Sequence, residues 1–170
     1  MILKILGVIS VLIGCGGVGF HIAYNYRREI KTLRQLINIL DFMECELQYH
    51  LTPLPELCRL TAHEFRDDPG PVFAKLATEM DSQVSTDVER CMQVSLASLK
   101  KIPPITRTGM EMLGKNLGRF DLSGQLKGIE SVRSDSVRKL RMLEDNRDNR
   151  IRSYQTLGLC AGAALAILLI

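Results

Sequence analysis

The sequence has no tryptophan, and aromatic residues make up only 5% of its 170 residues. Proteins that bind single-stranded nucleic acid stack the bases on aromatic side chains, so this sequence offers little material for such binding. The net charge is only +3, whereas a general nucleic-acid binder carries a strongly basic domain or stripe. We therefore expect no nucleic-acid partner.

The short motifs of common enzyme chemistry are missing as well. There is no Walker A sequence and no G-x-S-x-G sequence, and His63-Glu64 is not followed by the second histidine of H-E-x-x-H. We expect no catalytic residue, no cofactor site and no metal site, and hence a protein that is not an enzyme.

The cysteines do not form a recognisable metal site. Five cysteines occur without a C-x-x-C pair. Cys45, His50, Cys58 and His63 are enough ligands for zinc in number, but residues five apart on a helix diverge by about 140°. The cysteines are interpreted as free thiols. A small membrane sensor with an unrecognised site near Cys45, His50 and Cys58 stays an alternative.

Charge is missing from both ends of the chain. The stretch from Ile5 to Tyr26 contains no Asp, Glu, Lys or Arg, and neither does Ser153 to Ile170. About 20 helical residues cross the hydrocarbon core of a membrane, and about 18 are the lower limit. We predict transmembrane helices at residues 1–26 and 153–170, with a helical domain at residues 27–152 between them.

Two features of these ends add detail to that prediction. Gly158 and Gly162 have the spacing of small residues that lets membrane helices pack closely. Basic residues follow the first segment and precede the second, so the positive-inside rule places the central domain in the cytoplasm. The expected protein is a two-pass protein of the cell membrane. Leu12-Ile13-Gly14-Cys15 resembles a lipobox, however, which leaves an externally displayed lipoprotein as an alternative.

Between the two ends the apolar residues recur at helical spacing, and no stretch alternates like a strand. Helix breaks are predicted at Pro53 and Pro55, at the turn 67–71 and at Pro103-Pro104. Thr86-x-x-Glu89 predicts a capping box at one helix start. The fold class is therefore all-α: an antiparallel bundle of about six helices, flanked by two transmembrane helices.

Three segments together resemble one known family. They are Tyr26-Arg27-Arg28 with the run leading to Leu51-Thr52-Pro53-Leu54-Pro55-Glu56, the stretch from Leu117 to Gln125, and the apolar end from Leu157 to Ile170. This pattern, with apolar segments at both ends of about 170 residues, resembles the stage III sporulation protein AB family across essentially the whole chain.

That resemblance implies a function that the residues alone do not show. Members of the family are similar to the cytoplasmic domain of type II secretion system F proteins, which are membrane platform subunits. The implied role is a platform or adaptor of a secretion-like complex linking the mother cell to the forespore. The implied partners are a sporulation protein AA-like secretion ATPase and other stage III sporulation channel subunits, in the mother-cell membrane around the forespore. Self-association of the chain stays open.

Two motifs are the candidates for a partner interface. In Leu51, Thr52, Pro53, Leu54, Pro55 and Glu56, two prolines fix an inter-helix turn and Glu56 suits a first helical turn. The same hexapeptide also fits a docking loop for the ATPase. In the second motif, Gly118 suits a helix stop, Asp121 suits a helix cap, and Gln125 follows one turn later. Each motif therefore has a structural and a binding interpretation.

Overall fold

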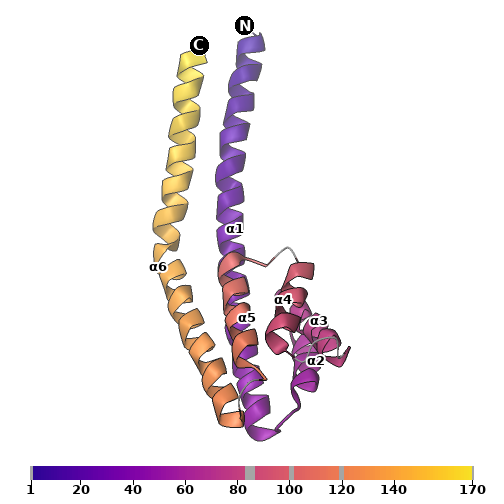
Figure 1. Ribbon diagram of the computed structural model, residues 1–170. Helices are drawn as coiled ribbons and strands as arrows, with labels where there is room; N and C mark the ends of the chain where they lie inside the picture. The colour runs from indigo at the N-terminus through magenta and orange to yellow at the C-terminus, as the bar shows by residue number, and fades with distance from the viewer. Residues whose placement is uncertain (1, 83–86, 100–101, 119–120, 170) are drawn as a thin grey trace. The chain divides into compact units, whose positions relative to one another are not determined.

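The computed structural model describes the backbone of residues 2–82, 87–99, 102–118 and 121–169, and the side chains of those between residues 24 and 145. Six helices occur in these residues, without a strand: α1 (Ile2–Tyr49), α2 (Leu54–Glu64), α3 (Gly70–Asp81), α4 (Val88–Ser98), α5 (Pro104–Asn116) and α6 (Leu122–Leu169) (Figure 1). The prediction of an all-α fold with six helices is confirmed.

The chain divides into two compact units. One holds Met1–Arg28 with Met142–Ile170, and the other holds Glu29–Arg141. The long helices α1 and α6 contribute to both units, whereas α2 to α5 belong to the second. In the first unit, the hydroxyl of Tyr26 donates a hydrogen bond to the backbone carbonyl of Leu143.

Among the residues with described side chains, no helix is apolar enough over a sufficient length to cross a membrane. The transmembrane helices expected at residues 1–26 and 153–170 fall almost entirely on residues 1–23 and 146–170, outside that set. Gly158 and Gly162 lie outside it too. Their proposed packing in lipid stays a prediction.

The core of the 29–141 unit is built from the apolar positions that recur at helical spacing. Burial of such side chains is the main force that holds a helical bundle together. The largest fully buried side chains come from α1 to α5, and they are Leu33, Leu36, Ile39, Leu40, Met43, Leu57, Phe73, Leu76, Met92, Leu96, Met110 and Leu113. Ile129 and Val132 of α6 are also buried.

Helices α1 and α6 run antiparallel within this unit. Asp41 of α1 forms an ion pair with Arg133 of α6. Five residues earlier in α1, Leu36 lies beside Gly109 of α5, and Ser136 of α6 lies beside the same glycine. The residue numbers rise along α1 as they fall along α6, which fixes the antiparallel register.

The inner helices α2 to α5 pack in chain order, each against the next. A Cβ atom on Gly114 of α5 would lie 2.7 Å from the Cβ of Met92 on α4. Only glycine permits this close approach of α5 to α4. At the far end of α2, the rings of Phe42 and Phe65 meet edge to face, with their centroids 5.8 Å apart.

The start of α5 is capped from another helix. Pro103 offers no side-chain cap and Pro104 has no amide hydrogen. The carboxylate of Glu29 on α1 accepts a hydrogen bond from the backbone amide of Ile105 instead. Burial raises the pKa of Glu29, and this hydrogen bond partly opposes the rise.

Helix α4 begins one residue away from the expected cap. The N-cap residue is Asp87, whose carboxylate accepts a hydrogen bond from the amide of Glu89 at 3.1 Å. The predicted capping box with Thr86 as its first residue is therefore wrong, and Thr86 itself lies outside the described residues. Both residue types cap helices well, so the sequence alone does not choose between them.

Candidate interaction site

The hexapeptide from Leu51 to Glu56 covers the end of the connection between α1 and α2 and the first residues of α2. Leu51 has a φ angle of 53°, a left-handed conformation that is uncommon for a residue with a side chain. The hydroxyl of Thr52 donates a hydrogen bond of 3.1 Å to the carboxylate of Glu46, and His50 Nδ1 lies 3.3 Å from the same oxygen. One half-buried carboxylate in the last turn of α1 therefore holds this turn in place.

Pro53 and Pro55 shape the start of α2. Pro53 is the N-cap residue, with φ −58° and ψ 143°, and its carbonyl accepts the first helical hydrogen bond, from the amide of Leu57 at 2.8 Å. Glu56 lies in the first turn, where a carboxylate favours the positive end of the helix dipole. It also pairs with Arg59 at 3.6 Å. The structural interpretation of these prolines is consistent with this geometry.

Gly118 ends the turn after α5 in a conformation that requires glycine. Its φ is +77°, and a Cβ atom there would lie 2.6 Å from Cγ2 of Val88 and 3.8 Å from Cδ2 of Leu54. The structure thus brings the second motif against the first one. It also places both beside the first turn of α4, a neighbour that sequence reasoning missed.

Asp121 caps α6 as predicted. Its side-chain oxygen Oδ1 accepts a hydrogen bond from the amide of Gly124 at 3.0 Å, and its backbone carbonyl accepts one from the amide of Gln125 at 2.9 Å. Gln125 is therefore part of the first turn of α6. Asp121 is exposed, so its carboxylate also faces solvent.

The end of the unit at which α1 and α5 stop and α2, α4 and α6 start is called the loop end below. Among the described residues there, three large apolar side chains are exposed: Tyr49, Leu51 and Leu122. Sequence reasoning named Leu51 but missed Tyr49, Leu122 and the role of Glu46. The only signal for them was their place next to helix ends.

The histidines and cysteines are the candidates for a metal site. In the region with described side chains, no group of three or more His, Cys, Asp or Glu residues could hold a metal ion. Cys45 is exposed, whereas Cys58 is buried and burial raises its pKa to about 12. These two thiols therefore differ in their access to solvent.

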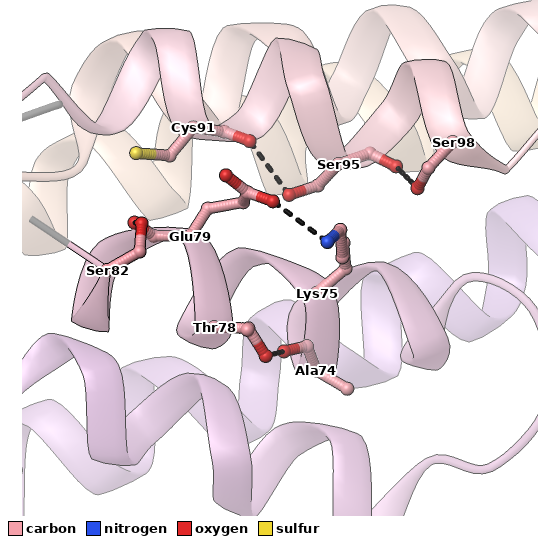
Figure 2. Close-up of polar contacts among 8 residues, drawn as sticks. All are labelled: Ala74, Lys75, Thr78, Glu79, Ser82, Cys91, Ser95 and Ser98. Carbon is pink, nitrogen blue, oxygen red and sulfur yellow. Dashed lines mark hydrogen bonds and ion pairs between the residues drawn. The ribbon is translucent and has the colours of Figure 1, made fainter. Parts of the chain in front are cut away.

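Figure 2 shows polar groups along α3 and along α4. The hydroxyls of Ser95 and Ser98 donate to carbonyl oxygens of Cys91 and Ser95, at 2.7 Å each, within α4 itself. Lys75 and Glu79 pair at 2.9 Å along α3. Burial and the nearby Glu79 carboxylate raise the pKa of Cys91. The two hydroxyls are therefore satisfied within their own helix, and burial disfavours the thiolate form of Cys91.

Comparison with known proteins identifies the family of the chain. The family described as stage III sporulation protein AB matches residues 4–170. The chain belongs to the stage III sporulation protein AB family. The resemblance seen in the sequence is thereby confirmed, and a role in sporulation follows from it.

Two relatives illustrate how far the similarity extends. Stage III sporulation protein AB of Bacillus subtilis (strain 168) is 24% identical over 170 residues, which cover 98% of this chain and 99% of that protein. A solved structure of stage III sporulation protein AB has a TM-score of 0.62 and 19% identity. It covers 72% of this chain and 98% of its own chain, and it supports the helical fold.

Proposed function

We propose that this stage III sporulation protein AB family member is a non-enzymatic adaptor of a secretion-like sporulation complex. Residues 1–26 and 153–170 anchor it in the cell membrane of the mother cell, and the helices between them lie in the cytoplasm. There the chain engages a secretion-type ATPase and other subunits of the sporulation channel. The similarity to type II secretion F proteins is part of this proposal.

One observation carries the proposal: two motifs that are far apart in the sequence are neighbours at the loop end, where a Cβ atom on Gly118 would lie 3.8 Å from Cδ2 of Leu54. Both are built from caps and turns: Thr52 bonds to Glu46, Glu56 pairs with Arg59, and Asp121 caps α6. A rigid end of this kind suits contact with another protein, because loops held by a scaffold commonly carry binding.

The membrane topology is tested with a native reporter. Cys45 is exposed on α1, whereas Cys58 and Cys91 are buried. In a chain with Cys15 and Cys160 replaced by Ala, a membrane-impermeant maleimide should label Cys45 only after the cells are permeabilised. Labelling of Cys45 in intact cells would place the helices outside, remove contact with a cytoplasmic ATPase and favour the lipoprotein alternative.

The adaptor role is tested with purified proteins. The full chain in lipid nanodiscs should retain the purified secretion-type ATPase of the same organism, with and without ATP, because docking of an adaptor needs no turnover. Empty nanodiscs are the control. If the ATPase is retained no better than by empty nanodiscs, its engagement by this chain is refuted.

A further inference from the structure

Leu51 is unusual in both its conformation and its exposure. Its φ of 53° disfavours any residue with a Cβ atom, and its side chain is 65% exposed. Glycine or asparagine would adopt the same conformation at lower cost and leave no apolar surface in water. The isolated fold gains little from a leucine at this position. Strained residues of this type gather at binding and switching sites.

The surroundings hold Leu51 in this outward position. The amide of His50 donates to the carbonyl of Glu46 at 3.0 Å, and the Thr52 hydroxyl donates to the Glu46 carboxylate, six residues earlier. The backbone is thus pinned on both sides of Leu51. An apolar side chain that is presented in advance loses little entropy when a partner covers it.

Leu122 lies at the same end as Tyr49 and Leu51. From the Asp41–Arg133 pair, Tyr49 is about 12 Å further along α1 and Leu122 is about 17 Å back along α6, at 1.5 Å per residue. Because the two helices are antiparallel, both residues arrive at the loop end. Figure 1 shows the end of α1 beside the start of α6.

The charges around these apolar residues determine which class of partner fits. In the terminal turns and caps at the loop end, the described charged residues are Glu46, Glu56, Asp87, Glu89 and Asp121, against Arg90 and Lys115. Arg59, in the second turn of α2, pairs with Glu56, and Lys115 lies 4.0 Å from Glu89. Carboxylates still outnumber these three basic groups. Arg119, in the same connection, lies outside the described residues. This predominance of carboxylates disfavours phosphate groups, and with them anionic lipid and nucleic acid, and it favours a basic surface.

We infer that the loop end is a docking surface for a protein segment in which an apolar side chain is flanked by lysine or arginine, and that Leu51 is its anchor. The inference rests on the proposed adaptor role but not on the ATPase being the partner. Buried apolar anchors of this kind dominate the binding energy of protein interfaces, whereas charged rims steer the encounter.

The test uses the full chain in sporulating cells of the organism that encodes it. The photoreactive residue p-benzoylphenylalanine replaces Tyr49, and adducts are digested and sequenced. The expected adduct joins a protein peptide rich in lysine or arginine around an apolar residue. Adding Leu51→Gly should lower its yield about tenfold. Glycine suits the φ of this position, so misfolding does not explain such a loss.

Matched control variants separate the roles of the Leu51 anchor and the surrounding carboxylates from effects of any surface substitution on the adduct yield. Val94→Thr alters an exposed apolar residue on α4 and should leave the yield within about twofold, because shallow exposed side chains contribute little. Glu56→Gln, in the first turn of α2, should lower the yield, whereas Glu64→Gln at the other end of the same helix should not.

Several outcomes would overturn the inference. They are an adduct with lipid, with nucleic acid or with a second copy of this chain alone, an acidic partner peptide, no adduct, or a yield unchanged by Leu51→Gly. A basic protein other than the ATPase would support this surface and show that the ATPase does not dock on it. If the ATPase binds the Leu51→Gly chain normally in nanodiscs, the ATPase stays in the proposed function and docks elsewhere on the chain.

Discussion

Replacing Gly118 by alanine tests how the two motifs are held together. The φ of +77° costs a residue with a Cβ atom about 1–2 kcal/mol. The new Cβ would also lie 2.6 Å from Cγ2 of Val88, so that side chain or the turn must move. Overpacking of this kind costs about 1–3 kcal/mol. Gly118→Ala should therefore destabilise the fold by about 2–5 kcal/mol.

The two contributions are separable by a double-mutant cycle. Val88→Ala alone leaves a partly buried position smaller and should cost about 1 kcal/mol. With Val88 already shortened, Gly118→Ala should lose its steric part and cost only the backbone part, about 1–2 kcal/mol. Gly118→Asn in the same background should be milder still, because asparagine adopts this conformation more readily.

Thermal unfolding of the purified full chain, followed by circular dichroism at 222 nm, measures the cycle. A loss of about 3 kcal/mol should lower the midpoint by roughly 6–12 °C. The reasoning is refuted if Gly118→Ala unfolds within about 2 °C of the wild type. An equal cost with and without the Val88 methyl groups would refute the steric part alone and leave the backbone part standing.

Three further changes probe other contacts. Asp121→Ala should lower the free energy of unfolding by about 1 kcal/mol in the same melting assay. Asp121→Asn keeps an acceptor for the Gly124 amide and should lose only a small part of that stability. With Cys15 and Cys160 replaced by Ala, Cys45 should react promptly with a disulfide reagent at pH 8. Cys58 should react only on unfolding, because burial raises its pKa to about 12. Burial also raises the pKa of Glu29, so the folded state binds its proton more tightly and stability from this group falls as pH rises above about 4.5. The free energy of unfolding of Glu29→Gln, measured in urea relative to the wild type, should therefore be higher at pH 7 than at pH 4. A difference between variant and wild type that is the same at both pH values would contradict this.

Much of the fold was predictable because local chemistry marks its helix ends. Pro53 and Pro104 stand at the starts of α2 and α5, where a missing amide hydrogen does no harm. Gly118 and Asp121 form a stop and a cap that need only their own neighbours. The helical spacing of apolar residues likewise predicted the core of the bundle, because that spacing is also visible in the local sequence.

The loop end was less predictable, because its decisive contacts join distant residues. Nothing in the local pattern places Val88 against Gly118, since that contact depends on how α4 packs beside α5. The cap of α4 at Asp87 was missed for a related reason. Two adjacent residues there are of types that cap helices well, and the local sequence does not choose between them.

Leu51 and Gly118 provide the sharpest contrast at the loop end. Both have positive φ angles, and both lie in connections between helices. Gly118 is explained within the chain, because the conformation and the nearby Val88 side chain each exclude a Cβ atom. Leu51 has no such explanation: its side chain fills no core position, and its conformation favours a smaller residue. A cost without a compensating contact in the fold is best explained by a contact outside it, which makes Leu51 the residue at which the adaptor role is tested most directly.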